Sequence, residues 1–147
     1  MLMTKVVSCG IILCPPAGWV IAHSTGNKHW DFPKGIAEVG EPHYLAALRE
    51  LQEETGFVFD DQHPSVKVRD LGQHSYTSGK DLHMWWVYLP NVVDIAKFKC
   101  TSMFEAYGKQ LPEVDYFLYK YPEEALPMLA KSMQAWVKAH VPAELLS

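Results

Sequence analysis

The sequence has few cysteines, and their number and spacing argue against the two usual cysteine-based scaffolds. Among 147 residues there are three, Cys9, Cys14 and Cys100, and no two of them have the CxxC spacing. An odd number without such a pair indicates neither a disulfide framework nor a cysteine zinc site. We therefore expect a chain that folds around a hydrophobic core in a reducing, cytoplasmic setting.

Long apolar runs are also lacking. The longest covers residues 6–14, is interrupted by Ser8 and Gly10, and is too short to cross a bilayer. Only Lys5 precedes it, and no convincing cleavage site of small residues follows, so a signal peptide is a minor alternative. We expect no association with membranes.

Positive charge is in deficit as well, with 13 Lys and Arg against 17 Asp and Glu and a net charge of −4. Proteins that bind nucleic acid through their overall field are usually basic, so a DNA-binding function is not expected. Any recognition of phosphate must be local and must use metal ions. The length and the 48% hydrophobic content predict one globular domain over residues 1–147.

Residue patterns predict strands on both sides of one clear helix. Two strands at residues 4–13 and 19–23 are expected to pair as a hairpin. The remaining elements follow as strands at residues 66–68, 73–77, 82–89 and 113–121, a helical turn at 122–126 and a helix at 128–140. Residues 92–109 have no clear pattern, and we interpret them as a loop beside the substrate pocket. The order predicts an α/β (α+β) fold with a mixed sheet covered by helices.

The clearest helix is expected at residues 41–55. Pro42 lies near its start, where a missing N–H costs nothing, and Gly56 follows its end as a left-handed C-cap requires. One apolar stripe repeats at helical spacing through Tyr44, Leu48, Leu51 and Thr55.

Three carboxylates share another face of the same helix. Glu50, Glu53 and Glu54 stand at i, i+3 and i+4, where they repel one another and raise one another's pKa unless a cation neutralises them. Hard oxygen ligands of this kind suit Mg²⁺ or Mn²⁺. Arg49 is placed to hold one carboxylate by a bidentate contact. The alternative is a solvated helix face, as most glutamate clusters are.

The spacing around these glutamates resembles the Nudix box. From Gly35 the chain reads glycine, five residues, Glu41, seven residues, then Arg-Glu-apolar-x-Glu-Glu-x-Gly-apolar, ending at Phe57 without a departure from the pattern. The resemblance implies an α/β/α sandwich with a mixed sheet. It also implies metal-dependent hydrolysis of a nucleoside diphosphate linked to another group.

The same resemblance implies a role for each residue of the box. Glu50, Glu53 and Glu54 become the ligands of Mg²⁺ or Mn²⁺, and Arg49 becomes the arginine that orients them. The backbone carbonyl at Lys34 is a further candidate ligand. Structural roles within the box fall to Gly35, Glu41 and Gly56.

A carboxylate that the metal does not saturate can accept the proton of the attacking water. Glu53 and Glu54 are candidates for this role. Glu113 is another, because family members often carry a base on a later loop or at the start of a strand. The alternative for Glu113 is an ordinary surface glutamate.

The substrate is less clear from the sequence. Residues 30–35 resemble the W-x-x-P-K-G entry of dinucleoside polyphosphate hydrolases, and also that of RNA 5′-pyrophosphohydrolases and decapping enzymes. Lys34 would lie beside the phosphates as a point charge, or serve only as a loop lysine. Tyr76 stands at about the distance from the box where diadenosine polyphosphate hydrolases carry a tyrosine that contacts the nucleotide. It could equally be a plain strand aromatic.

The strand at residues 82–89 places His83 and Trp85 on one face and Trp86 on the other. Trp85 could stack on a base, and His83 could contact a phosphate or base. Packing in the core is the alternative for the tryptophan, and a structural role is the alternative for the histidine.

We therefore expect a diphosphatase for a small nucleotide, with a dinucleoside polyphosphate such as diadenosine tetraphosphate as the first hypothesis. Other nucleotide substrates remain open: an RNA 5′ end, nucleoside triphosphates, ADP-ribose and nucleotide sugars. A non-catalytic nucleotide-sensing domain is the alternative of another class. The oligomeric state remains open.

Overall fold

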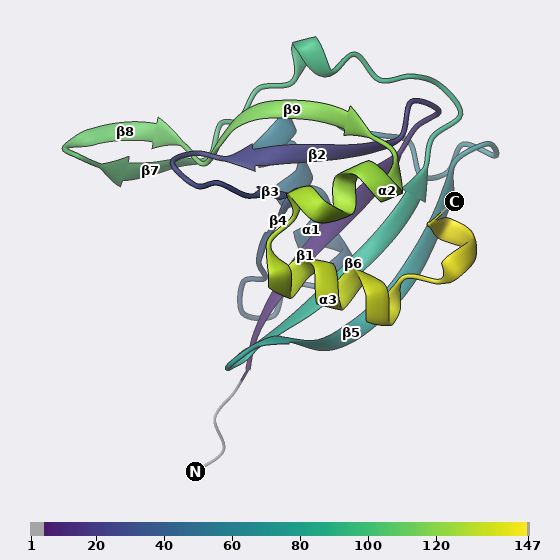
Figure 1. Cartoon of the computed structure of the whole chain (residues 1–147), viewed down its shortest axis with the longest axis horizontal. Helices are drawn as coiled ribbons and strands as arrows, with labels where there is room; N and C mark the ends of the chain where they lie inside the picture. Colours follow the sequence, from purple (N-terminus) through teal and green to yellow (C-terminus); the bar gives the residue numbers. More distant parts are fainter. Residues whose placement is uncertain (1–4, 147) are drawn as a thin grey trace.

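The computed structural model describes residues 5–146, which form layers of sheet and helix (Figure 1). The strands are β1 (Val6–Cys14), β2 (Trp19–Ser24), β3 (Trp30–Asp31), β4 (Lys34–Ile36), β5 (Lys67–Thr77), β6 (Lys80–Tyr88), β7 (Met103–Ala106), β8 (Lys109–Pro112) and β9 (Val114–Lys120). The helices are α1 (His43–Thr55), α2 (Pro122–Ala125) and α3 (Lys131–His140). Short 3₁₀ turns occur at Ile95–Lys97, Leu126–Met128 and Ala143–Leu145.

The main sheet is mixed and has the strand order β4-β1-β6-β5. Strand β1 runs parallel to β6 and antiparallel to β4, whereas β5 and β6 are antiparallel. A second, antiparallel sheet has the order β3-β2-β9, and β7 pairs only with β8 in a separate hairpin. Helix α1 covers one face of the main sheet, and α3 covers the other (Figure 1). The predicted mixed-sheet α+β fold is confirmed.

Strand β1 is the centre of the fold because both of its faces are buried. Ile12 packs into the cluster under α3, while Ile11 packs into the cluster under α1, and neither side chain is exposed to solvent. A strand buried on both faces has an almost continuous apolar sequence instead of an alternating one. The apolar run at residues 6–14 is therefore a central strand.

The predicted hairpin between the first two strands is wrong. Strand β1 pairs with β4 and β6, whereas β2 pairs with β3 and β9, so the two strands belong to different sheets. The connecting turn contains Pro15 and Pro16, which have no N–H to donate to a ladder. Thr4, the first residue of the predicted strand, lies outside the described residues.

Two other boundaries differ from the prediction. The two predicted strands around Gly72 form one strand, β5, with an irregularity in its pairing between Asp70 and Gln73. The last helix begins at Lys131, because Leu129 is extended and forms a bridge with Trp30. The predicted interruption and the predicted earlier start of the helix were therefore wrong.

The structure also bears on expectations about the membrane and the cysteines. Within residues 5–146, no helix is long and apolar enough to cross a bilayer. Cys9, Cys14 and Cys100 are all free thiols.

Two histidine rings stack where α3 meets β5, and this contact predicts a dependence of stability on pH. The rings of His74 and His140 lie 3.7 Å apart and are nearly parallel, at 2°. Burial, with the charge of His74, lowers the pKa of His140 below its usual 6.5. The unfolded chain then binds more protons than the folded chain as the pH falls below 6.5, so the stability from this site is lost in that range.

We expect a smaller fall in melting temperature between pH 7.5 and pH 5.5 for His140→Asn than for the wild type. Thermal unfolding monitored by circular dichroism measures the difference. The exposed His29 supplies the control His29→Asn, which should keep the wild-type pH dependence. An unchanged pH dependence in His140→Asn would count against this source of instability.

Candidate active site

The glutamate face of α1 is not a solvated surface. Only 8% of Glu50 and 6% of Glu54 is exposed, whereas the side chain of Glu53 is 41% exposed. Carboxylates are rarely buried unless they are paired or bind a cation. The burial of two of the three glutamates therefore requires a specific reason, which their partners provide in part.

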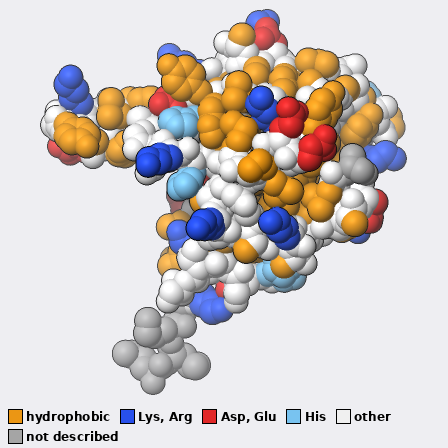
Figure 2. Space-filling view, in the orientation of Figure 1, with side chains coloured by type: hydrophobic (Ala, Val, Ile, Leu, Met, Phe, Trp, Pro, Cys, Tyr) orange, Lys and Arg blue, Asp and Glu red, His pale blue; other side chains and the backbone are white. Residues whose placement is uncertain are grey.

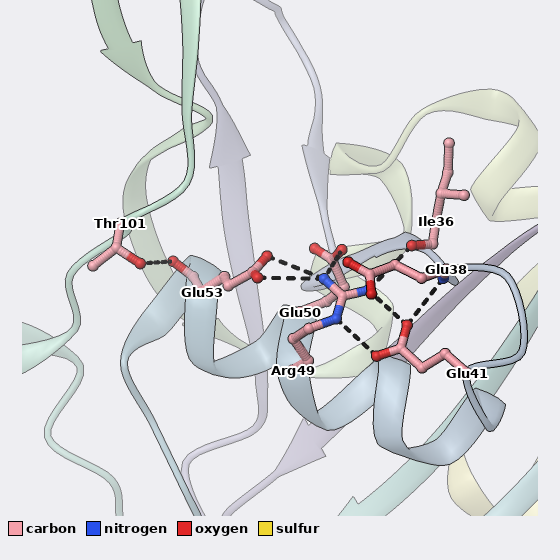
Figure 3. Close-up of polar contacts among 7 residues, drawn as sticks. All are labelled: Ile36, Glu38, Glu41, Arg49, Glu50, Glu53 and Thr101. Atoms are coloured by element: carbon pink, nitrogen blue, oxygen red, sulfur yellow. Dashed lines mark hydrogen bonds and ion pairs between the residues drawn. The ribbon is translucent and has the colours of Figure 1, made fainter.

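Arg49 accounts for the burial of Glu50. Its guanidinium lies among three carboxylates and a backbone carbonyl (Figure 3). It donates from Nε and Nη2 to the two oxygens of Glu41, both at 2.9 Å. From Nη1 it donates to Glu50 at 2.9 Å and to Glu53 at 3.3 Å. The bidentate contact was expected with one of the three glutamates, but the structure places it on Glu41, and Glu50 and Glu53 receive hydrogen bonds from Nη1 alone.

Glu41 fixes the loop that precedes the helix. One of its oxygens also accepts a hydrogen bond from the backbone N–H of Glu38 at 3.0 Å, and Nη2 of Arg49 reaches the carbonyl of Ile36 at 3.2 Å. The hydrogen bonds from Arg49, with that from Glu38, lower the pKa of Glu41 to about 2. The loop and helix are thus joined through one arginine.

Replacement of Arg49 by lysine should reduce turnover about tenfold to a hundredfold, the usual effect of losing a group that orients metal ligands. A single ammonium cannot reproduce the fork that holds Glu41 while it also reaches Glu50. Steady-state kinetics of Arg49→Lys measure the effect. The exposed Arg69 supplies the matched control Arg69→Lys, which should behave as wild type. Equal activity in the two variants would contradict an orienting role for Arg49.

Gly35 leaves room for the carboxylate of Glu50. A Cβ atom at position 35 would lie 2.2 Å from Cδ of Glu50 and 2.3 Å from each of its oxygens. The backbone φ of Gly35 is not positive, whereas Gly40 has φ +77°. Gly40 therefore provides a backbone conformation that favours glycine, whereas at position 35 glycine is needed because Glu50 approaches so closely. Gly56 is the left-handed C-cap of α1, as predicted, with φ 75°.

Glu54 has no comparable partner. Its carboxylate forms no hydrogen bond or ion pair with another side chain or backbone group of residues 5–146. Burial, reinforced by the negative charge of Glu50, raises the pKa of Glu54 to about 9. Burial also raises the pKa of Glu50. Two adjacent buried carboxylates can both be ionised at neutral pH only if a cation compensates them.

A cavity of about 310 Å³ opens beside Glu54. Its charged lining residues are Asp31, Lys34, Glu54 and Glu113, which come from β3, β4, α1 and the bend between β8 and β9. The volume lies near the lower end of the range for small-molecule sites. Glu113 also raises the pKa of Glu54 through its charge. Residues far apart in the sequence thus meet at one cavity, including three of the predicted site residues.

Lys34 is the cation of this cavity. Its Nζ lies 2.9 Å from Oδ2 of Asp31, and it lies 5.7 Å from the centre of the Tyr76 ring. Burial alone lowers the pKa of Lys34, but the neighbouring Asp31, Tyr76 and Glu54 raise it, and the net pKa is above its usual value. The ammonium is therefore charged at neutral pH. Asp31 was missed from the sequence, although its i, i+3 spacing to Lys34 was a usable signal.

The other predicted substrate contacts lie elsewhere. Trp85 is 6% exposed and packs under α1, where its ring stacks on His83 at 4.0 Å. His83 bonds to Asp70 at 2.7 Å and to His43 at 3.0 Å. Neither side chain lines the cavity at Glu54. Their contacts beneath α1 favour structural roles, and a contact of either side chain with the substrate remains a prediction that this cavity does not support.

Tyr76 also does not line the cavity. It packs at the edge of the core beneath α3, and its hydroxyl accepts a hydrogen bond from Ser132 at 3.4 Å. Its ring approaches the cavity only through Lys34. Tyr76 is thus placed to support Lys34, and a direct contact with substrate remains a prediction.

The donor set at α1 fits a divalent cation in its chemistry, although not in its present arrangement. No three His, Cys, Asp or Glu side chains of the described chain converge tightly enough to form a ready-made metal site. Figure 3 shows that Arg49 holds both Glu50 and Glu53. Buried Glu54 supplies an unpaired carboxylate. Glu53, which is partly exposed and held at 3.3 Å, can turn away from Arg49 to join it.

The end of α1 is tied to the segment that leads into β7. The carbonyl of Glu53 accepts hydrogen bonds from the N–H of Thr101 at 2.7 Å and from its hydroxyl at 3.1 Å. The N–H of Lys99 donates to the carbonyl of Thr55 at 2.9 Å. The segment interpreted from sequence as a loop therefore also contains a 3₁₀ turn and strand β7. It contributes Phe104 to the cavity.

Solved structures with this fold include an Ap4A hydrolase, a MutT protein and a pyrophosphohydrolase. An Ap4A hydrolase from C. elegans has a TM-score of 0.65 and 17% identity, over 90% of this chain and 93% of that chain. The MutT protein from Methanosarcina mazei Go1 has a TM-score of 0.64 and 17% identity, over 95% of each chain. The E. coli dihydroneopterin triphosphate pyrophosphohydrolase has a TM-score of 0.62 and 14% identity, over 90% and 92%. At these identities the likeness shows the fold alone.

The comparison with curated protein sequences found no match. The family described as NUDIX domain matches residues 4–107, which include every residue of the glutamate motif and all four strands of the main sheet. This chain accordingly belongs to the Nudix hydrolase family and is a pyrophosphohydrolase.

Proposed function

We propose that this Nudix hydrolase cleaves a diphosphate bond of a nucleotide at the cavity beside α1, with Mg²⁺ or Mn²⁺ as its cofactor. The observation that carries the proposal is Glu54, a buried carboxylate that has no hydrogen bond or ion pair within residues 5–146 and lines the same cavity as Lys34. Nudix hydrolases generally use divalent metal ions. A diphosphate needs both features, because its own negative charge repels a nucleophile.

Each side chain of the site has a proposed role. Glu50, Glu53 and Glu54 hold the cation, which when bound lowers the pKa of water and neutralises phosphate charge. The backbone carbonyl of Lys34 is a further candidate ligand. Arg49 positions Glu50 and Glu53 and does not contact the substrate.

Lys34 binds a phosphate oxygen. It is already charged and held by Asp31, so little reorganisation is needed when the substrate enters.

A carboxylate that Arg49 does not hold is better suited to accept a proton. Glu113 lines the cavity and forms no ion pair with another residue of the described chain. We therefore favour Glu113 as the general base, with Glu53 and Glu54 as alternatives. Replacement of the base should reduce kcat without a matching rise in KM, since its action is confined to the transition state.

For the substrate we favour a dinucleoside polyphosphate such as diadenosine tetraphosphate. Support comes from Lys34 in the W-x-x-P-K-G segment and from its placement in the cavity. The C. elegans protein with a similar fold is an Ap4A hydrolase, which is compatible with this substrate. Nucleoside triphosphates and the 5′ end of RNA carry the same diphosphate group and are the main alternatives, followed by ADP-ribose and nucleotide sugars. The three free cysteines suit the reducing cytoplasm in which such nucleotides would be met.

The test is a product assay on a panel of substrates with Mg²⁺ and, separately, Mn²⁺. The panel contains diadenosine tetraphosphate, nucleoside triphosphates, ADP-ribose, a nucleotide sugar and 5′-triphosphorylated RNA. We expect fastest turnover of diadenosine tetraphosphate, with ATP and AMP as products. Faster turnover of another member would change the proposed substrate and leave the proposed diphosphatase activity intact. Absence of product from every member with both ions would instead favour a domain that binds nucleotides without cleaving them.

A further inference from the structure

Phe104 is a large aromatic residue that has no role in the core. It lies on β7 of the β7–β8 hairpin, which projects from the body of the molecule (Figures 1 and 2). Its side chain is partly buried, yet it belongs to none of the hydrophobic clusters and has no ring contact with another residue of the described chain. It lines the cavity that contains Glu54. A phenylalanine that faces a cavity without packing partners is available to a ligand.

Thr25 lines the same cavity and carries a second unused group. Its Oγ1 atom is buried and has no hydrogen-bond partner. A buried hydroxyl without a partner costs free energy, and a polar atom of a ligand would remove that cost. The cavity also contains three buried apolar side chains, Ala22, Phe32 and Val114. Together with Phe104 these features favour a ligand group that is flat and apolar on its faces but polar at its edge.

Backbone hydrogen bonds hold these parts together. The N–H of Thr25 donates to the carbonyl of Glu113 at 3.1 Å, and the N–H of Glu113 donates to the carbonyl of Ser102 at 2.9 Å. Ser102 stands two residues before Phe104, and the next residue back, Thr101, is bonded to α1 through Glu53. Backbone hydrogen bonds therefore fix the positions of the hairpin base, the loop at Thr25 and helix α1 relative to one another.

From these observations we infer that Phe104 and Thr25 form a subsite for the nucleobase of the substrate. The base stacks on the Phe104 ring, and the Thr25 hydroxyl bonds to a polar atom at its edge. The inference rests on the proposed function in that the cavity receives a nucleotide whose phosphates lie at Lys34 and Glu54. Stacking on an aromatic ring tolerates every base, so Phe104 supplies affinity and Thr25 supplies discrimination among bases.

Binding of AMP and of ribose 5-phosphate, measured by titration calorimetry with Mg²⁺ present, tests this subsite without any need for turnover. We expect wild type to bind AMP more tightly than ribose 5-phosphate, which lacks a base. Phe104→Ala should weaken AMP binding by about tenfold or more, the usual effect of losing one stacking contact, and leave ribose 5-phosphate unchanged. Phe104→Tyr should retain the preference for AMP.

Thr25→Val provides an independent variant of similar shape, and Thr25→Ser is its matched control because it keeps the hydroxyl. We expect the valine variant to change the ranking of AMP, GMP, CMP and UMP, and the serine variant to preserve it. Met103→Ala, on the same strand but not in the cavity lining, should bind as wild type.

The subsite is overturned if wild type shows no preference for AMP over ribose 5-phosphate, or if Phe104→Ala weakens both ligands equally. An intact preference for AMP in a protein that hydrolyses nothing would instead support the subsite and reject the proposed function. The two failures are therefore distinguishable.

Discussion

Replacing Glu54 by glutamine is expected to reduce kcat for diphosphate hydrolysis by about a hundredfold to a thousandfold, the usual loss when one group that stabilises the transition state is removed. Glutamine has the shape of the protonated acid, so the packing around this buried position is preserved. What disappears is the negative charge that the cation requires. Steady-state kinetics with saturating Mg²⁺ measure the loss. Wild-type kcat in Glu54→Gln would exclude Glu54 from the chemistry.

Thermal unfolding separates this effect from misfolding. Because burial raises the pKa of Glu54 from 4.5 to about 9, the folded metal-free protein binds more protons than the unfolded chain between these values. Its stability therefore falls as the pH rises from 4.5 towards 9. Glu54→Gln should lack this part of the fall. At pH 8, Mg²⁺ should raise the melting temperature of wild type and have little effect on the variant.

Alanine at Gly35 is expected to reduce metal affinity and turnover about tenfold to a hundredfold, as the displacement of a metal ligand does. The new Cβ would lie 2.2 Å from Cδ of Glu50, so the carboxylate must move. The fold should survive, because the displaced atoms are the end of one side chain and not backbone. Calorimetric titration of Mn²⁺ measures the affinity.

Gly40→Ala is the matched control in the same loop. A Cβ there meets no atom within 4 Å, although the φ of +77° strains any residue other than glycine. We expect Gly40→Ala to reduce stability and keep wild-type Mn²⁺ affinity. If Gly35→Ala also kept wild-type Mn²⁺ affinity, the close packing of Gly35 against Glu50 would not be needed for metal binding.

Local patterns in the sequence predicted those elements whose form is set by their own residues. Helix α1 ends before Gly56 because the αL cap is local, and strand β6 buries Trp85 and Met84 on opposite faces because side chains alternate. The partner of β1 was not predictable in this way. Val6 lies opposite Lys80, and pairing over such a separation depends on the assembled sheet and not on the turn after β1.

The same distinction between local and long-range contacts applies to the site residues. Spacing within the motif identified Arg49 and the three glutamates, since a helix places i, i+3 and i+4 together. Spacing could not predict that Gly35 makes room for Glu50, nor that Phe104 and Thr25 face the same cavity as Glu54, because these contacts join separate elements. The role of Trp85 was left open for a related reason: an aromatic strand residue has the same pattern whether it faces a ligand or a helix.

The most direct test of the account is turnover of diadenosine tetraphosphate by purified wild type and by the double variant Glu53→Gln/Glu54→Gln, each with Mg²⁺ and with excess chelator. Chromatography of the products gives the rate and the bond cleaved. We predict ATP and AMP from wild type with Mg²⁺, and no product above background with chelator or from the double variant. Cleavage that persists in the chelator, or in the double variant, would contradict a metal-dependent reaction at the glutamates of α1.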